Sequence, residues 1–298
     1  MGELEKPEHI RAALDALGTR QDGKPAAART AKPKRACLSE VLGMAVEKQY
    51  FTVPVNPLGT VKWAAPKSVE EVDPDSVANP RQVRTLLRAV REQGARGTHL
   101  EAFFGCLYYA AMRPAEATAL TRGQCRLPET GWGTLTLRRG VVRAGAGWTD
   151  DGTAHEQRQL KARAEGDSRP VPIPPFLVQM LRAHLERFGT APDGRLFRTS
   201  RGGLLQETGY GEVWARARAE ALTEEERASL LARRPYDLRH AGVSLWLASG
   251  VDPMECARRA GHTIAVLFRV YAKVLAHAQH QANERIDAAM REWNTPDT

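Results

Sequence analysis

The residues of this chain best suited to chemistry include a few lysines that stand out against an arginine-rich background. The chain has 43 lysine and arginine residues against 35 acidic ones, which gives a net charge of +8 at pH 7. Beyond Lys67 only Lys161 and Lys273 occur, beside 30 arginines. A lysine amine can release a proton, whereas a guanidinium keeps its proton at any working pH. Both lysines are therefore candidate acid-base groups, with chance retention as the alternative.

Composition narrows the partners and the class of protein. The basic balance favours an anionic partner, most commonly nucleic acid. Hydrophobic residues at 42% and charged residues at 26% are typical of a globular protein and exclude a fibrous one. No run of eighteen apolar residues and no secretory signal occur, so we expect a cytoplasmic protein without a membrane partner. The four cysteines form no CxxC pair, which argues against a zinc site and favours reduced thiols.

Four segments of the chain carry candidate catalytic groups. They are AAMRPAEATAL around Arg113, QLKARAEGDSRPVPIP around Lys161, RRPYDLRHAGVSLWLASGV around Arg239, and RRAGHTIAVLFRVYAKV around His262 and Tyr271. Each residue taken alone also has an ordinary explanation. Arg113 and Lys161 could be solvated charges, His262 could cap a helix, and Tyr271 continues an apolar stripe typical of a core. Arg239 could pair with the neighbouring carboxylate of Asp237.

Taken together, these segments resemble the tyrosine recombinase (phage integrase) family. That family's catalytic domain carries an arginine after a helix, a hairpin lysine, a histidine-x-x-arginine box, a Gly-His, and a tyrosine nine residues beyond that histidine. The order is complete here, and nine residues separate His262 from Tyr271. The resemblance runs from about residue 80 to the C-terminus and includes GRLFRTSRGGLL as the loop before the late helices. It implies a site-specific recombinase that acts on double-stranded DNA as a homotetramer.

The resemblance also implies a role for each residue. Arg113 and Arg239 would clamp the scissile phosphate, since a guanidinium holds two phosphate oxygens in a fixed geometry. Tyr271 would attack the phosphorus and form a covalent 3′-phosphotyrosine, which conserves the bond energy without ATP. Lys161 would protonate the departing 5′-oxygen, and His262 would hydrogen-bond the phosphate. Neither a metal ion nor another cofactor is implied, because the arginines supply the positive charge.

The sequence departs from the family at two places. Tyr236 occupies the position of the usual histidine and is a weaker acid-base group near neutral pH; the adjacent His240 is expected to point elsewhere and to serve a structural role. Residues 1–66 resemble only the later part of the family's core-binding domain, through KPAAARTAKPKRA and NPLGTVKW. This predicts a truncated or remnant integrase, or a true start further upstream. This region also contains a basic cluster, which consists of Lys24, Arg29, Lys32, Lys34 and Arg35. The cluster either binds DNA phosphates, with an affinity that falls steeply with salt, or is simply solvated.

The elements that must position these residues follow from periodicity and helix signals. Asn79-Pro80 starts a helix with an N-cap and a proline at the first helical position. Other helices are expected within residues 1–17 and over 36–49, 99–111, from Pro114, and over 175–188, 208–221, 224–232, 237–249, 253–260 and 264–277, the last continuing toward Met290. The segment 18–34 could be a loop or the entry to the second helix.

Strands are expected at 134–139 and at 169–174, the latter on a sheet edge because of its prolines, with Lys161 in the polar loop between them. The predicted fold is mostly helical with a small antiparallel sheet around residues 132–174. Proline-rich residues 52–79 are typical of an interdomain linker. We therefore expect a partial helical core-binding domain at 1–66, a linker at 67–79, and a catalytic domain with a C-terminal helix at 80–298.

Three alternative functions stay open from the sequence. A type IB topoisomerase would use the same residues without bringing two sites together. A non-catalytic DNA-binding integrase remnant or regulator would use the arginines only to hold phosphate. A metal enzyme built on His277 and His280 lacks a third ligand at suitable spacing.

Substitution of Tyr236 tests the first departure. Tyr236→His is expected to preserve or raise the rate of DNA strand cleavage, because imidazole exchanges protons near neutral pH. Tyr236→Phe is expected to lower that rate, because it removes the hydroxyl that donates to phosphate. Single-turnover cleavage rates measure both effects, and equal rates for all three proteins would remove Tyr236 from the site.

Overall fold

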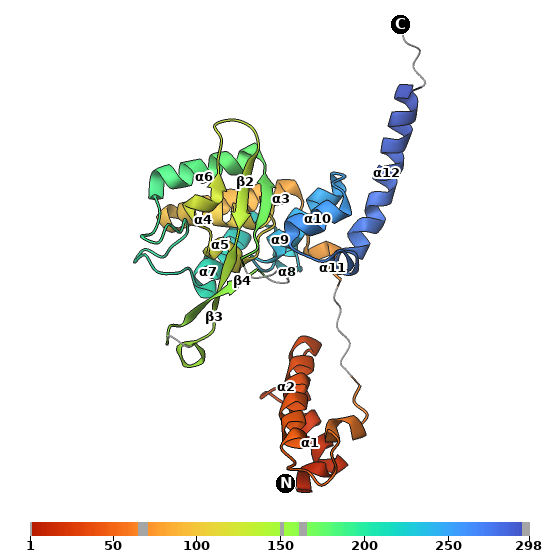
Figure 1. Ribbon diagram of the computed structural model, residues 1–298. Coiled ribbons are helices and arrows are strands. Elements are labelled where there is room, and N and C mark those ends of the chain that lie inside the picture. The colour runs from red at the N-terminus through yellow and green to blue at the C-terminus, as the bar shows by residue number, and fades with distance from the viewer. Residues whose placement is uncertain (1, 65–70, 150–151, 161–165, 294–298) are drawn as a thin grey trace. The chain divides into compact units, whose positions relative to one another are not determined.

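The computed structural model describes residues 2–64, 71–149, 152–160 and 166–293, and its chain divides into two compact units, residues 1–70 and 71–298 (Figure 1). Unit 1 contains α1 (Pro7–Gly18), α2 (Ala28–Glu47) and a 3₁₀ turn at Pro57–Thr60. The basic stretch before Ala36 belongs to α2, which begins at Ala28 and includes Pro33.

The core of unit 1 recruits residues that the sequence places in a linker. Ile10 and Leu14 of α1 and Leu42 of α2 pack with Leu58 and Val61. The proline-rich segment 52–79 is therefore packed near its beginning. Near its end it is packed as well, because Val72 is buried in unit 2 and its N–H donates to the carbonyl of Val270 at 2.8 Å.

Unit 2 holds the other described α-helices and every strand found among the described residues. Its helices are α3 (Pro80–Arg91), α4 (Gly94–Tyr109), α5 (Pro114–Thr118), α6 (Pro175–Phe188), α7 (Glu207–Ala221), α8 (Glu224–Ala228), α9 (Asp237–Ala248), α10 (Pro253–Ala260), α11 (Ile264–Val270) and α12 (Ala272–Trp293). The start of α3 agrees with the prediction, because Asn79 and Gln82 form a reciprocal capping box. No described helix is both long and apolar enough to cross a lipid bilayer.

Helix α4 lies in the centre of unit 2 and contacts α3, α5, α6 and α9. Phe103 and Phe104 on this helix are fully buried and pack edge-on, with ring centroids 5.4 Å apart. Phe104 also contacts Trp214 of α7. Because α4 is buried from Ala102 to Tyr108, its C-terminal half is a rigid support for the loop that carries Arg113.

The predicted small antiparallel sheet is confirmed. Its three strands are β1 (Cys125–Arg126), β2 (Gly133–Leu137) and β5 (Arg169–Ile173), in the order β1-β2-β5. Leu135 lies opposite Val171 in the β2–β5 register, and β5 is an edge strand as its prolines predict. The fold class predicted from the sequence, mostly helical with this sheet, is therefore correct.

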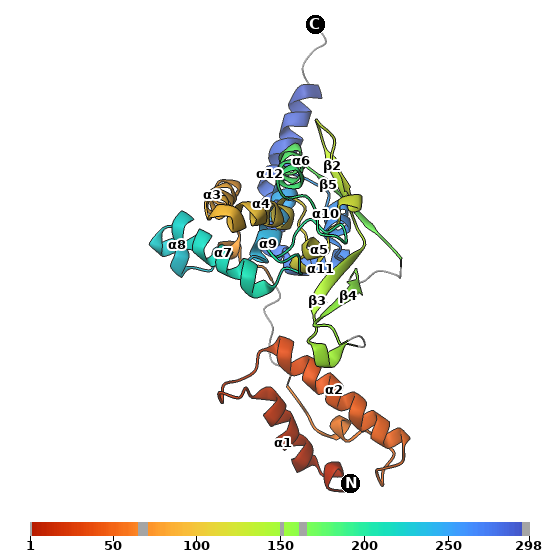
Figure 2. The same ribbon diagram turned by 90° about the vertical axis from the view of Figure 1, so that its left-hand side faces the viewer.

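A second hairpin, β3 (Arg139–Arg143) with β4 (His155–Gln159), was not expected. Its strands alternate poorly between apolar and polar residues, so periodicity does not indicate them. Gly140 packs against Ala115 of α5, where an added Cβ would lie 3.4 Å from the alanine Cβ. Figure 2 shows the hairpin extending from the body of unit 2, and its base lies beside the helix that follows Arg113.

The last predicted helix is interrupted. The structure ends α11 at Val270 and begins α12 at Ala272, so Tyr271 lies at the break, with φ −111° and ψ 22°. Helix α8 is also shorter than predicted, because Ser229 leaves the helical region and Ala232 has a φ of 45°.

Candidate active site

Arg113 lies at the N-terminal end of α5, directly after the tight turn that follows α4. Ala111 in this turn has a φ of 44°, a left-handed conformation that a non-glycine residue adopts only when its surroundings require it. The Arg113 guanidinium donates to Oε1 of Glu116 at 2.8 Å and to the carbonyl of Gly261 at 3.0 Å. Its own N–H donates to the other carboxylate oxygen at 2.8 Å, so α5 begins with a carboxylate-capped turn.

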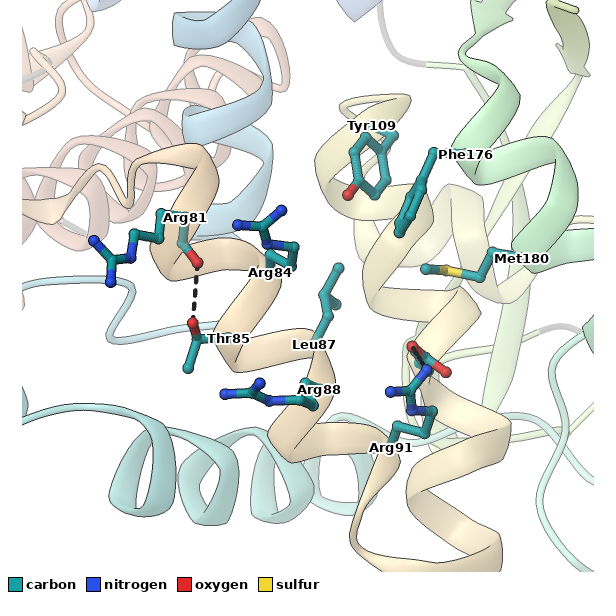
Figure 3. Close-up of a pocket in the computed structure, with 10 residues that line it drawn as sticks. Arg81, Arg84, Thr85, Leu87, Arg88, Arg91, Tyr109, Phe176 and Met180 are labelled. Atoms are coloured by element: carbon teal, nitrogen blue, oxygen red, sulfur yellow. Dashed lines mark hydrogen bonds and ion pairs between the residues drawn. The ribbon is translucent and has the colours of Figure 1, made fainter.

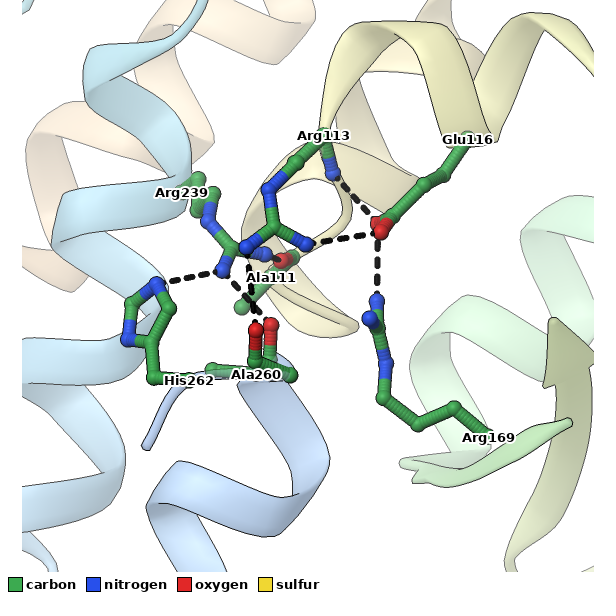
Figure 4. Close-up of polar contacts among 8 residues, drawn as sticks. Ala111, Arg113, Glu116, Arg169, Arg239, Ala260 and His262 are labelled. Carbon is green, nitrogen blue, oxygen red and sulfur yellow. Dashed lines mark hydrogen bonds and ion pairs between the residues drawn. The ribbon is translucent and has the colours of Figure 1, made fainter. Parts of the chain in front are cut away.

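Arg239 lies in the first turn of α9 and is completely buried. It does not pair with Asp237, whose carboxylate instead accepts from Arg234 at 2.9 Å. Arg239 donates to the carbonyls of Ala111 and Ala260, the latter at 2.6 Å (Figure 4). The left-handed turn at Ala111 thus brings a backbone acceptor to the guanidinium, and the C-terminal end of α10 supplies the other.

Glu116 and Arg169 complete this cluster, and sequence reasoning assigned a role to neither. Arg169, the first residue of β5, is completely buried and donates to Oε2 of Glu116 at 2.7 Å. Burial acts to raise the pKa of Glu116, but the charges of Arg169, Arg239 and Arg113 outweigh it and lower that pKa to about 2. The Glu116 carboxylate therefore accepts hydrogen bonds from Arg113 and Arg169 and interacts with Arg239 only through its charge. One negative charge among three guanidinium groups leaves the cluster with an excess of positive charge.

The turn between α10 and α11 passes close to Arg169. Gly261 is left-handed, with a φ of 65°, and a Cβ at this position would collide with Nη1 of Arg169. Glycine is therefore required both by the backbone conformation and by the space. This turn directs His262 toward Arg239, whose Nη2 lies 2.7 Å from Nε2 of the imidazole.

His262 is a neutral ring with a defined proton. Burial, reinforced by the charges of Arg239 and Arg113, lowers the pKa of His262 to about 3. Because a guanidinium has no acceptor, Nε2 must accept from Arg239, and the ring proton lies on Nδ1. That Nδ1 is buried and has no hydrogen-bond partner among the described residues.

Tyr271 is buried at the break between α11 and α12 and contacts His240, which corrects the expectation that His240 points elsewhere. Nδ1 of His240 and Oη of Tyr271 are 3.0 Å apart. The sequence expectation considered only the place of His240 on its own helix, next to Arg239, and not the residues that pack against that helix. The His240 ring also contacts the ring of Tyr236, with centroids 5.2 Å apart. Motif reasoning had no signal for the contact with Tyr271, because it joins α9 to the residue after α11, and no local spacing relates the two.

Both partners of that hydrogen bond are neutral. Burial raises the pKa of Tyr271 well above its ordinary value of 10.0, although Arg239 and Arg113 act in the opposite direction. Burial lowers the pKa of His240 to about 4. The phenol therefore keeps its proton at pH 7 and holds it next to an uncharged imidazole, which can accept it.

The cluster has more donors than acceptors. Four buried side-chain nitrogens of the cluster have no hydrogen-bond partner among the described residues: Arg239 Nε, Arg169 Nε and Nη1, and His262 Nδ1. Buried donors are normally satisfied, and leaving each one unpaired costs on the order of 1–3 kcal/mol. An anion with several oxygens is the ligand that such a deficit fits.

The structure brings together five of the six catalytic residues predicted from the sequence: Arg113, Tyr236, Arg239, His262 and Tyr271. The sixth, Lys161, lies outside the described residues. Its loop precedes β5, whose first residue contacts Glu116. In unit 1, Lys24, Arg29, Lys32 and Lys34 are exposed, and Arg35 lies over the ring of Trp63, 5.2 Å from its centroid. Within the described ranges, no group of three or more His, Cys, Asp or Glu residues could hold a metal ion.

Replacement of Glu116 tests the central position of its carboxylate. Glu116→Gln should lower the free energy of unfolding at pH 7 by about 3 kcal/mol, because it leaves buried guanidinium groups without their counter-charge. The folded pKa is depressed, so the wild-type advantage is complete above the unfolded value and disappears as the pH falls from 4.5 to about 2. Urea unfolding of both proteins at a series of pH values measures this difference in the free energy of unfolding. Glu212→Gln, which removes an exposed pair with Arg96, is the control and should change little; equal losses in both variants would contradict the prediction.

In sequence, the chain is similar to two phage integrases. It is 28% identical to the integrase of Mycobacterium phage L5 over 132 aligned residues. The aligned segment covers 43% of this chain and 31% of that protein. It is 26% identical to the integrase of Mycobacterium phage FRAT1 over 155 aligned residues, a segment that covers 51% of this chain and 42% of that protein. The matches thus span less than half of either relative. No protein-family model matches the chain.

In structure, the chain is similar to DNA-bound recombinases at low sequence identity. The integrase of transposon Tn1549 in complex with transposon right end DNA has a TM-score of 0.67 and 16% identity, over 95% of this chain and 85% of that one. The XerH site-specific recombinase bound to palindromic difH substrate has a TM-score of 0.61 and 14% sequence identity, and the match covers 99% of this chain and 73% of that one. Lambda integrase bound to DNA has a TM-score of 0.55 and 15% sequence identity, and the match covers 89% of this chain and 80% of that one. The resemblance to the tyrosine recombinase family that the motifs indicate is therefore confirmed, by sequence similarity to phage integrases and by a shared fold.

Proposed function

We propose that this protein is a site-specific DNA recombinase that cleaves and rejoins DNA strands through a covalent 3′-phosphotyrosine on Tyr271. One observation carries the proposal: Arg113, Arg239, His262 and Tyr271, from separate parts of the chain, meet in one buried, positively charged cluster with unpaired donors. The DNA-bound relatives of the same fold support the choice of DNA as substrate.

A phosphodiester fits this cluster in charge and in hydrogen bonding. It carries one negative charge, and further charge accumulates on its non-bridging oxygens at the transition state. Arg113 and Arg239 would hold these oxygens, and the proton on Nδ1 of His262 supplies a further donor. Because the guanidinium groups are already anchored by Glu116 and by backbone carbonyls, little reorganisation accompanies the reaction.

The proposed reaction conserves bonds and protons. Oη of Tyr271 attacks the scissile phosphorus, the bond from phosphorus to the 5′-oxygen breaks, and a 3′-phosphotyrosine and a free 5′-hydroxyl result. Lys161 gives its proton to the departing 5′-oxygen, in line with the family resemblance. A 5′-hydroxyl of another strand then attacks the phosphotyrosine and releases Tyr271, which rejoins DNA.

His240 is the group best placed to take the proton from Tyr271. Its Nδ1 is 3.0 Å from the phenol oxygen, within the range required of a general base. The charges that flank it include Arg239 and Arg234, which disfavour an imidazolium, and Asp237, which favours one. A bound phosphodiester adds negative charge to this region and makes protonation of His240 easier. This assigns to His240 the role that Tyr236 is poorly suited to fill.

The other parts of the chain fit DNA binding and assembly. The exposed cations of unit 1, which include Arg29 and Lys32 on α2, would bind phosphates on DNA. Helix α12 exposes Ile286 and Met290, which are 57% and 54% accessible. We propose that this apolar edge docks on a neighbouring subunit of a tetramer assembled on DNA.

A covalent trapping experiment tests the proposed function. Wild-type protein and Tyr271→Phe are incubated with radiolabelled nicked duplexes that cover the DNA flanking the protein's own gene, and a denaturing gel separates the products. We expect a protein-linked band with wild type and none with Tyr271→Phe, because only the phenol oxygen can form the linkage. The same gel locates the cleavage site.

The absence of a band distinguishes two other outcomes. If an N-terminally extended protein forms the linkage and this chain does not, unit 1 is insufficient to close on DNA. If neither forms it although both bind DNA, the chain is a non-catalytic DNA-binding protein and the proposal is wrong.

A sulfur-substituted substrate separates the base from the acid. Replacing the bridging 5′-oxygen by sulfur creates a leaving group that needs no proton. His240→Gln should slow cleavage of both substrates about a hundredfold, and its rate should rise with pH as tyrosinate forms without help. Lys161→Ala should slow only the oxygen substrate. A His240→Gln defect that is independent of pH would assign His240 a purely structural role.

A further inference from the structure

A groove on unit 2, lined by α3, α4 and α6, shares no residue with the candidate active site. It encloses a volume of about 430 Å³ (Figure 3). A second hollow of about 370 Å³ shares Arg91, Glu101, Phe176 and Met180 with it and continues along α6 to Arg187. The two hollows adjoin at these shared residues, and we call them together the α3–α6 groove.

One wall of the α3–α6 groove is a row of arginines. Arg81, Arg84, Arg88 and Arg91 recur at intervals of three and four residues, so they share one face of α3, and all four are exposed. With a rise of 1.5 Å per residue, the row is about 15 Å long. Arg91 pairs with Glu101 at 3.8 Å, whereas the other three have no ion pair with any described residue.

The floor of the groove is apolar. Leu87 is buried beneath the arginines, and Tyr109 and Phe176 lie opposite, with ring centroids 5.5 Å apart. Phe176, in the first turn of α6, is 52% exposed. Met180 contributes a flexible side chain that adapts to apolar groups. A helix face with free arginines thus borders an exposed aromatic floor.

We propose that the α3–α6 groove binds an acidic amphipathic helix of a partner protein. Carboxylates at intervals of three and four residues along such a helix match the spacing of Arg81, Arg84 and Arg88, and guanidinium groups pair well with carboxylates. Its apolar face would cover Phe176 and Met180, as in helix-in-groove recognition. Charge complementarity and the exposed floor together determine this choice.

Duplex DNA fits the groove less well. Phosphates would pair with the arginines but would leave Phe176 and Tyr109 without an apolar partner. In both views the β3–β4 hairpin projects from one end of unit 2, and α3 and α6 lie toward the opposite end (Figures 1 and 2). The groove is therefore separate from the hairpin beside the candidate active site.

Fluorescence anisotropy of the full chain with a labelled peptide tests the proposal. The peptide, of about 18 residues, forms a helix with Glu at i, i+3, i+7 and i+10 beside a leucine face. A matched peptide carries Gln in place of each Glu. We expect the Glu peptide to bind and the Gln peptide to bind at least tenfold more weakly. R84Q/R88Q should weaken binding of the Glu peptide about tenfold, and Phe176→Ser should weaken it as well.

R216Q/R227Q, which removes two exposed arginines outside the groove, is the matched control and should bind like wild type. Weakening by this control equal to that of R84Q/R88Q would mean non-specific attraction and would overturn the proposal. An equal loss of affinity of R84Q/R88Q for duplex DNA would make the groove a nucleic-acid surface instead. Self-association of wild type that R84Q/R88Q abolishes, measured by sedimentation, would identify a second copy as the occupant and would overturn it too.

Discussion

The carboxylate of Glu116, buried among three guanidinium groups, is the interaction on which the candidate site depends. Arg169 and Arg239 are completely inaccessible to solvent, and a buried charge without compensation is strongly destabilising. Glu116 compensates Arg113 and Arg169 directly. Arg239 is compensated by backbone carbonyls, one of them at the C-terminal end of α10, where the helix dipole is negative. The cluster keeps an excess of positive charge, which under the proposed function would hold the scissile phosphate.

This cluster also determines how distant segments meet. Glu116 belongs to α5, Arg169 to β5 and Arg239 to α9, and the turn at Gly261 closes over Arg169. Apolar packing is not directional, whereas the hydrogen bonds of the guanidinium groups to the Glu116 carboxylate and to backbone carbonyls require particular distances and angles. The polar cluster therefore specifies relative positions that apolar packing leaves loose.

Around this charged centre the acid-base groups are kept neutral. His240 and His262 have pKa values of about 4 and 3, and the phenol of Tyr271 retains its proton. Neutral imidazoles next to arginines avoid additional repulsion, and the neutral ring of His240 can accept a proton at Nδ1. The structure thus separates permanent charge, held by arginine, from exchangeable protons, held by histidine and tyrosine. This division suits a reaction in which charge develops on phosphate oxygens while a proton leaves the nucleophile.

The sequence by itself determined the fold class, most helices, the edge strand at β5 and the family resemblance. Helices and their caps are local, so the start of α3 at Asn79 and Pro80 could be predicted from residues adjacent in the sequence. Only the tertiary structure decided how Glu116 joins Arg169, that α11 breaks at Tyr271, and that His240 contacts the phenol. These features depend on burial and on contacts between residues far apart in the chain, and no local spacing encodes them.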